Sequence, residues 1–394
     1  MTDLASIPII DTDTHILEPP DLWTSRMSSR WGDLVPHVRW HEPEGGGEPE
    51  EYWFVGDRPI FAGGRAAQFN WPEFCPEHPL RFEDADPACW DPGRRLRWMD
   101  EAGVHAQVLY SNVAMFSAGD LVGAEAAFTD ECIRAYNDFQ TEWSSVAPDR
   151  LLPMTQLPFW NLDWTLAEME RCAAAGHRGI VFSQEPANFG LPALADPYWD
   201  RLWAAAQEMR LPVNFHIASG DNSLLLNNGG YAGAGLHANF SWTGVWMMMG
   251  NLRTISQLIV GGVCHRFPDL NFVSVESGVG WLPFALEALD WQWRNCGVPQ
   301  EHPEFDLLPS EYFKRQIYGC FWFETDVAMA AIDLLGADNI LYETDFPHAT
   351  SMTPGPASVA TMPREHIATH LSGLPEATLR KVLHDNAARL YGLG

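Results

Sequence analysis

The sequence is poor in positive charge. It has 24 lysine and arginine residues against 52 aspartate and glutamate residues, which gives a formal net charge of -28. Proteins that bind nucleic acid or anionic membranes need a basic footprint, so this balance argues against both classes of partner. It does not exclude a small anionic substrate, because such a substrate responds to the electric field within its binding site rather than to the net charge of the whole protein.

Three further signals are missing. The seven cysteines are scattered, odd in number and contain no Cys-x-x-Cys, which favours reduced thiols over a disulfide framework or a thiolate zinc site. No basic segment followed by an apolar stretch opens the chain, and no run approaches the roughly 18 apolar residues of a membrane span. We therefore expect a cytoplasmic protein that is not bound to membranes.

Known nucleotide and nucleophile motifs are also missing. The sequence contains no Walker loop, no Gly-rich dinucleotide fingerprint and no Gly-x-Ser-x-Gly elbow. What it does contain is 46% apolar and 12% aromatic residues over 394 positions, enough for a large core.

The chain contains eight short apolar runs, the first at 7–15 and the other seven after position 90, mostly separated by amphipathic segments. Runs that do not alternate in polarity are typical of a parallel sheet covered on both faces. Strands are predicted near 7–15, 106–110, 151–157, 179–182, 212–215, 271–275, 317–323 and 339–342, and helices at 95–102, 125–146, 162–175, 196–209, 245–266, 281–294, 326–335 and 375–391. This order predicts an α/β fold, a (β/α)8 TIM barrel forming a single domain over 1–394. A doubly wound open sheet is the alternative, but it would be expected to carry a Gly-rich turn after its first strand.

A long insertion follows the first predicted strand. Residues 19–92 are rich in proline, glycine and tryptophan and show no regular period, so we expect an irregular insertion or lid over the barrel. Within it, residues 41–51 are acidic and rich in glycine and proline. We expect them to form an exposed, mobile loop whose removal leaves the fold intact.

Polar side chains stand at the ends of four predicted strands. The first strand ends at Asp11, Asp13 and His15, which alternate and would point the same way. Alone, this stretch is explained equally well by a turn with an Asp-rich cap. His216, Glu276 and Asp345 end the fifth, sixth and eighth strands, and a parallel barrel brings such ends to one face. Carboxylate and imidazole groups together bind zinc, manganese or iron, so the pattern predicts a divalent metal site.

Several longer segments carry a family resemblance that covers nearly the whole chain. They are 9–23 (Ile-Ile-Asp-Thr-Asp-Thr-His-Ile-Leu-Glu-Pro-Pro-Asp-Leu-Trp), 95–104, 265–272, 276–281, 343–348 (Glu-Thr-Asp-Phe-Pro-His) and 385–391. In combination they resemble the amidohydrolase superfamily, in the amidohydrolase-related branch that contains aminocarboxymuconate-semialdehyde decarboxylase and the resorcylate decarboxylases.

The resemblance implies roles for individual residues. It implies metal ligands at Asp13, His15, His216 and Asp345, with Asp13 at a position that is commonly histidine. It implies catalytic roles for Asp345, Glu276 and His216, although Glu276 replaces a histidine frequent in the family. The strand at Gly179 runs into Ser183 and Gln184 with no lysine, so a lysine-bridged pair of metals is not expected.

Three further residues remain open between functional and structural roles. Glu18, His237 and His348 could contact substrate or support the ligands, or could serve only as loop and capping residues. The resemblance implies a metal-dependent decarboxylase acting on a small unsaturated or aromatic carboxylate, in a homodimer or larger assembly. A metal-dependent hydrolase of a C–C, amide, ester or thioester bond is the alternative reaction, and a non-catalytic ligand-binding barrel is the alternative of another class.

Overall fold

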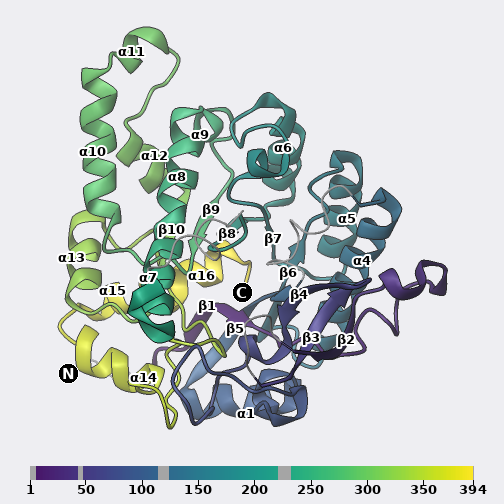
Figure 1. Ribbon diagram of the computed structural model, residues 1–394. Helices are drawn as coiled ribbons and strands as arrows, with labels where there is room; N and C mark the ends of the chain where they lie inside the picture. The colour runs from purple at the N-terminus through teal and green to yellow at the C-terminus, as the bar shows by residue number, and fades with distance from the viewer. Residues whose placement is uncertain (1–5, 43–47, 114–123, 221–231, 394) are drawn as a thin grey trace.

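Eight parallel strands form the centre of the molecule. The computed structural model describes residues 6–42, 48–113, 124–220 and 232–393. The strands are β1 (Ile9–His15), β5 (Val104–Tyr110), β6 (Leu151–Gln156), β7 (Gly179–Val181), β8 (Val213–His216), β9 (Phe272–Val275), β10 (Ile317–Phe321) and β11 (Ile340–Tyr342). They lie in sequence order, as the βα repeat predicts (Figure 1).

The sheet closes on itself just beyond the last strand. The backbone N–H of Asp345 donates to the carbonyl of Asp13 at 3.0 Å, and that of His15 donates to the carbonyl of Phe346 at 2.7 Å. These bonds join β1 to the segment that follows β11, and they confirm the predicted (β/α)8 TIM barrel. They also place the chain around Asp345 beside the end of β1.

Helices surround the barrel and cover its outer face (Figure 1). They are α1 (Pro92–Ala102), α4 (Ala126–Ser144), α5 (Leu162–Ala174), α6 (Asp200–Met209), α8 (Gly250–Val260), α9 (Val263–Arg266), α10 (Leu282–Asn295), α11 (Val298–Glu301), α12 (Pro309–Gln316), α13 (Asp326–Leu335), α14 (Pro363–His366), α15 (Glu376–Arg380) and α16 (Asn386–Leu390). No helix in the described ranges is long and apolar enough to cross a membrane.

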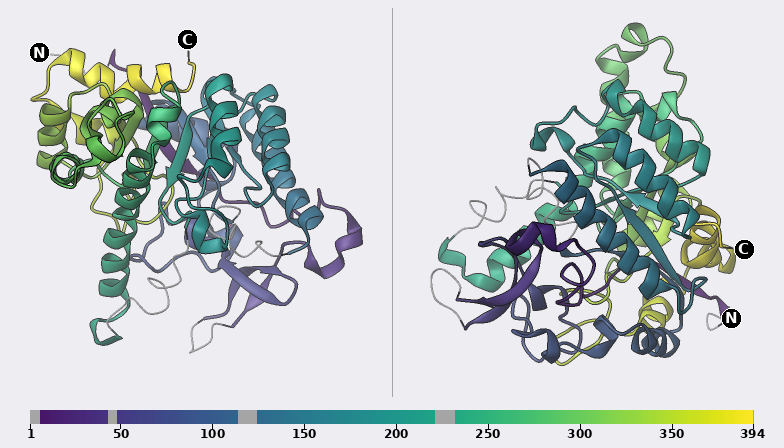
Figure 2. Two further views of the ribbon diagram at one scale, coloured as in Figure 1. Left: turned by 90° about the horizontal axis from the view of Figure 1, so that it is seen from above. Right: turned by 90° about the vertical axis from the view of Figure 1, so that its right-hand side faces the viewer.

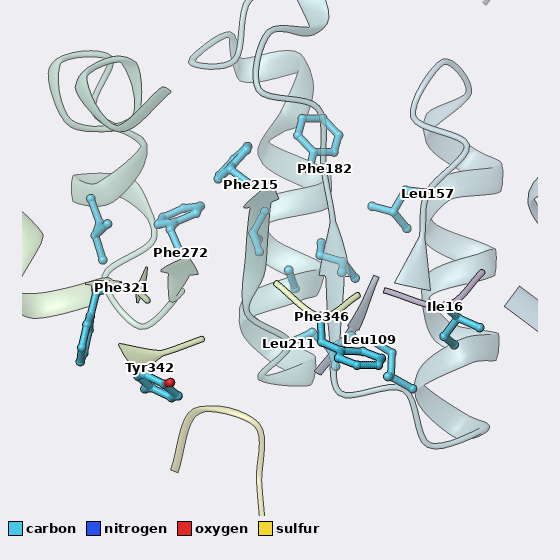
Figure 3. Packing of buried hydrophobic residues seen from close by; sticks show 14 of the residues in the cluster. Ile16, Leu109, Leu157, Phe182, Leu211, Phe215, Phe272, Phe321, Tyr342 and Phe346 are labelled. Atoms are coloured by element: carbon cyan, nitrogen blue, oxygen red, sulfur yellow. The ribbon is translucent and has the colours of Figure 1, made fainter. Parts of the chain in front are cut away.

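Two apolar cores hold these layers together. Outward-facing strand residues, including Phe182, Phe215 and Phe272, pack under the helices, and their rings lie in a row across neighbouring strands (Figure 3). Inward-facing residues such as Val108 and Tyr110 fill the barrel itself and pack against α16. Because successive strand residues face opposite sides, most of these strands contribute to both cores, which explains their apolar sequences. In β8 only Val213 and Phe215 join an apolar core, and they alternate with the polar Asn214 and His216.

The insertion after β1 is more regular than the sequence predicts. It contains a three-stranded antiparallel sheet of β2 (His37–His41), β3 (Glu50–Val55) and β4 (Arg58–Ala62). The expected loop 41–51 therefore begins and ends in strands, and residues 43–47 lie outside the described part. Glu50 is buried and pairs with His78 at 2.7 Å, so the C-terminal end of the range 41–51 is not a free loop.

The predicted single helix over 245–266 is wrong. The chain instead forms α7 (Leu236–Met248), α8 and α9, and α7 begins nine residues before the predicted start. A side chain at Gly250 would come within 3.1 Å of Gln184, so glycine lets that residue approach the break between α7 and α8. Gly262 has a φ of 72°, which separates α8 from α9.

The expected closing helix over 375–391 is present with one irregularity. A π-helical turn at Lys381–Asp385 joins α15 to α16. The C-terminus lies at one end of the barrel, whereas α7 and the β2–β4 sheet project from the opposite end, where the strands finish (Figure 2).

Candidate metal and catalytic site

Four strand ends bring their polar side chains to one mouth of the barrel. Asp13 and His15 come from the end of β1, and His216 is the last residue of β8. Glu276 directly follows β9, and Asp345 lies three residues beyond β11. Ligand atoms of Asp13, His15, His216 and Glu276 all lie within 4.8 Å of one another, and so do those of His15, Glu276, Asp345 and His348.

The two histidines face each other at the centre of this cluster. Nε2 of His15 lies 3.0 Å from Nε2 of His216, and 3.5 and 3.6 Å from the carboxylates of Asp13 and Asp345. Nε2 of His216 lies 3.4 Å from Asp13 and 3.3 Å from Glu276. Two imidazole nitrogens bound at right angles to one cation, each about 2.1 Å away, would be separated by about 3 Å.

Backbone carbonyls fix both rings in the orientation that a metal needs. Nδ1 of His15 lies 3.2 Å from the carbonyl of Ser111, and Nδ1 of His216 lies 2.7 Å from the carbonyl of Ile217. A carbonyl can only accept, so each Nδ1 carries the hydrogen and each Nε2 presents a lone pair to the cluster.

The surroundings of the Asp13 carboxylate indicate whether a cation fits in this cluster. Its side chain is completely buried, yet no described residue donates a hydrogen bond to either carboxylate oxygen. A buried carboxylate without donors is costly, and a cation among these oxygens and nitrogens would satisfy it. The cluster therefore has the chemistry of a metal site and could hold a divalent cation.

Glu276 and Asp345 have an unusual backbone conformation. Their φ angles are 54° and 60°, in the left-handed region that residues with a side chain rarely adopt. Such conformations cost on the order of 1–3 kcal/mol each and gather at functional sites. Here they turn both carboxylates toward the mouth directly after a strand ends.

Burial and mutual repulsion raise the pKa of the clustered carboxyl groups. Burial raises the pKa of Glu276, of Asp345 and of the neighbouring Glu343 well above their ordinary values, and the nearby carboxylates raise each further. Burial alone would lower the pKa of His216, but the Asp13 and Glu276 carboxylates outweigh it and raise that pKa to about 9. The carboxylates thus make this position favourable for positive charge.

Two further carboxyl groups support the site. Asp11 belongs to the pattern of Asp11, Asp13 and His15 that predicted the metal site, but it lies outside both clusters. It accepts hydrogen bonds from the backbone N–H and hydroxyl of Thr344 at 2.8 and 2.6 Å, which ties β1 to the Asp345 segment. Glu343 accepts a bond from the backbone of Glu276 at 3.2 Å. Its only sequence signal is its position at the end of a strand.

The three residues left open by sequence lie in different places. His348 stacks on the ring of His15 and lies 2.8 Å from Asp345, inside the site. Glu18 is buried, but its carboxylate accepts hydrogen bonds from the backbone N–H groups of Asn112 and Val113 and is not part of either cluster. His237 lies on α7, not in a loop. It is exposed, and its Nδ1 lies 2.8 Å from the carbonyl of Cys75.

Known proteins share this sequence pattern and fold. A gamma-resorcylate decarboxylase from Polaromonas sp. (strain JS666 / ATCC BAA-500) is 26% identical over 307 residues, which cover 76% of this chain and 86% of the relative. An amidohydrolase structure from Mycobacterium avium subsp. paratuberculosis K-10 has a TM-score of 0.72 and 20% identity, covering 98% of this chain and 100% of that one.

A second solved structure includes a metal. It is a dihydroxybenzoic acid decarboxylase from Polaromonas sp. JS666 with bound manganese and the inhibitor 2-nitroresorcinol, with a TM-score of 0.61, 20% identity and coverage of 98% and 97% of the two chains. The sequence profile of the amidohydrolase family matches residues 10–393, nearly the full length described above. The chain therefore belongs to the amidohydrolase family and is an enzyme of that superfamily.

Proposed function

We propose that this enzyme is a metal-dependent decarboxylase of a small aromatic or unsaturated carboxylate. The observation that carries the proposal is the convergence of Asp13, His15, His216, Glu276 and Asp345 at the barrel mouth. Relatives whose names describe decarboxylases of hydroxylated aromatic acids support the choice of reaction and substrate class.

In this proposal Asp13, His15, His216 and Asp345 hold one divalent cation, and manganese, zinc and iron all suit such mixed oxygen and nitrogen ligands. The manganese bound in the related dihydroxybenzoic acid decarboxylase favours manganese. A bound cation would polarise a substrate oxygen and neutralise the carboxylate that is to leave. The carbonyls of Ser111 and Ile217 keep the two imidazoles aimed at it.

Asp345 is proposed as the group that moves a proton. The bond between the substrate carbon and its carboxylate breaks, carbon dioxide leaves, and the electron pair stays on that carbon until a proton forms the new C–H bond. As a ligand of the cation the Asp345 carboxylate would be ionised, so it would take up a proton that arrives with the substrate and pass it to this carbon. A positioned acid of this kind contributes about two to four powers of ten in rate.

The insertion shelters this segment from solvent. The backbone N–H groups of Gln68 and Phe69 donate to the carbonyl of Pro347 at 3.0 and 3.2 Å, and the ring of Phe69 packs on Phe346. Excluding water strengthens the electrostatic interactions in a site and limits competing attack by water. This favours loss of carbon dioxide over hydrolysis.

One observation favours hydrolysis as a second candidate. The Glu276 carboxylate is 15% exposed and lies 3.3 Å from Nε2 of His216. A carboxylate open to solvent beside a metal site could take a proton from an attacking water. The two reactions are separated by their products.

Screening tests the proposal directly. Manganese-loaded enzyme would be incubated with hydroxylated benzoates and unsaturated di- and tricarboxylates, while released carbon dioxide is measured. We expect release from at least one of these acids and its loss in Asp345→Asn. Hydrolysis of ester or amide substrates without carbon dioxide release from any acid would contradict the proposal.

A further inference from the structure

Glu276 is the carboxylate of the cluster that is most open to an entering substrate. Its side chain is 15% exposed, whereas those of Asp13 and Asp345 are 0% and 1% exposed. It reaches this position with a φ of 54°, and a residue with a side chain keeps such a conformation only when its surroundings enforce it. The contacts on both sides of Glu276 show what enforces it.

The peptide group before Glu276 is fixed at both of its polar atoms. The carbonyl of Val275 accepts a hydrogen bond from Nδ2 of Asn251 at 3.3 Å, and the N–H of Glu276 donates to the carboxylate of Glu343 at 3.2 Å. Rotation of this peptide group would break both bonds. A change in φ at Glu276 would therefore have to move the chain that follows it.

Glu324 holds the chain that follows. It lies three residues beyond β10 and is only 5% exposed. Its Oε1 accepts hydrogen bonds from the backbone N–H groups of Val279 and Gly280 at 3.0 and 2.7 Å. A Cβ at Gly278 or Gly280 would lie 3.0 Å from this carboxylate, so glycine at both positions lets it approach the backbone. Hydrogen bonds to an ionised acceptor are stronger than those between neutral groups, so the turn is held firmly.

The Asn251 amide is oriented by its own partners. Asn251 is fully buried on α8, and its Nδ2 donates to the carbonyl of Phe215 at 2.9 Å as well as to that of Val275. Because carbonyls only accept, the amide oxygen must face Nε2 of Gln184, which donates to it at 2.6 Å. Both carbonyls belong to residues directly before site residues, so one amide ties the ends of β8 and β9 together.

We propose that Glu324 is a positioning residue that, together with Asn251, clamps residues 275–280 and keeps the Glu276 carboxylate at the mouth, where it contacts the substrate. The catalytic part of this inference rests on the proposed decarboxylation. Glu324 belongs to neither cluster of possible metal ligands, so it acts on the reaction through Glu276. Asn251 also holds the residue before His216, so it acts on the metal site as well.

A double-mutant cycle separates positioning from a purely structural role. Glu324→Ala should lower kcat about 10- to 100-fold while manganese affinity stays within about twofold, because its bonds go to the backbone of Val279 and Gly280. Glu324→Gln keeps the side-chain size and one acceptor oxygen, so it should recover most of this loss. In a Glu276→Gln background, Glu324→Ala should change kcat by less than about twofold, because the clamp acts through Glu276. Effects that multiply in the double variant would overturn the proposal.

Asn251→Ala tests the other side of the clamp, with Asn386→Ala as its matched control. Asn251→Ala should lower kcat and weaken manganese binding by about 10-fold, as expected for a residue that supports a ligand. Asn386 is also fully buried and donates to two backbone carbonyls, those of Ala337 and Ile340, where α16 meets the start of β11. Its variant should keep both quantities within about twofold of the parent enzyme. Equal losses in the two variants would overturn the role of Asn251.

Asp290→Ala is the matched control for Glu324→Ala. Asp290 also accepts hydrogen bonds, from the backbone N–H and the hydroxyl of Ser310 at 2.9 and 2.7 Å, and it lies on α10, which projects away from the barrel (Figure 1). Its kcat should stay within about twofold of the parent enzyme. A loss as large as that of Glu324→Ala would contradict a specific effect of the clamp.

The position of Glu276 can be observed without any substrate. Crystal structures of the manganese-loaded parent enzyme, Glu324→Ala and Glu324→Gln would be compared. We expect Glu276 to leave the left-handed region and its carboxylate to move away from His216 in Glu324→Ala, and both to be retained in Glu324→Gln. An unchanged Glu276 in Glu324→Ala would overturn the proposal. The expected movement in an enzyme that releases no carbon dioxide would uphold the clamp and refute the decarboxylase function.

Discussion

Replacing His216 with alanine tests the metal site at its centre. Nε2 of His216 lies within 3.4 Å of His15, Asp13 and Glu276, so its loss removes the nitrogen shared by most of the cluster. Losing a residue that merely supports a ligand weakens metal affinity by about 10- to 100-fold, so losing a ligand itself should weaken it by at least about 100-fold.

The expected change in thermal stability follows from this loss of affinity. At a manganese concentration of about 100 times Kd, binding stabilises the folded state by about 2.7 kcal/mol, and after a 100-fold loss by about 0.4 kcal/mol. Unfolding 394 residues carries an entropy of about 0.8 kcal/mol/K, so the parent Tm should rise by about 3 °C and that of His216→Ala by about 0.5 °C.

The assay is a thermal melt at several manganese concentrations together with elemental analysis of the dialysed protein. His237→Ala is the control, because His237 is exposed on α7 and bonded to the backbone of Cys75. It should keep both the metal and the rise in Tm. Stoichiometric manganese in His216→Ala, with an unchanged rise in Tm, would refute the metal site as described.

Three further predictions concern other parts of the chain. Glu276→Gln should lower kcat about 100-fold while retaining manganese, because it keeps the side-chain size and removes the charge; unchanged kcat would exclude a catalytic role. Burial lowers the pKa of His177 from 6.5 to about 4. The contribution of its neutral side chain to the free energy of unfolding is therefore complete above pH 6.5 and is lost as the pH falls from 6.5 toward 4. When the pH is lowered from 7.5 to 5, the free energy of unfolding measured in urea should therefore fall by about 2 kcal/mol less in His177→Gln than in the parent. An equal fall in the two proteins would contradict this. Replacing residues 43–47 with two glycines should change Tm by less than about 2 °C, provided the Glu50–His78 pair remains, whereas a large drop would show that the segment is structural.

The barrel was predictable because each strand is an apolar run that ends abruptly in polar residues. The convergence of Asp13, His216 and Asp345 at the barrel mouth could be predicted in this way, because a parallel barrel brings the carboxyl ends of its strands to one face. Homo-oligomer formation stays a prediction. Light scattering should give at least twice the mass of one chain, and the uncharged, exposed residues Val245 and Trp246 on α7 offer a surface for such contact.

The missed features depend on contacts that are distant in sequence. The β2–β4 sheet mixes buried and exposed residues, and its tight packing around Trp53 could not be read from an irregular pattern. The break at Gly250 depends on Gln184, which comes from a different βα unit. Asn112 gives no signal in the sequence, and its contacts with the carbonyl of Ile16 and with the ring of His348 arise only because the fold brings these three residues together.

Running the reaction in labelled water tests the central claim most directly. With an active acid identified, one sample would be run in deuterium oxide and another in oxygen-18 water, and the organic product analysed by mass spectrometry. Decarboxylation predicts one deuterium at the carbon that lost its carboxylate and no oxygen-18 in the organic product. Oxygen-18 in a new carboxylate of the product, without release of carbon dioxide, would contradict the account and establish hydrolysis.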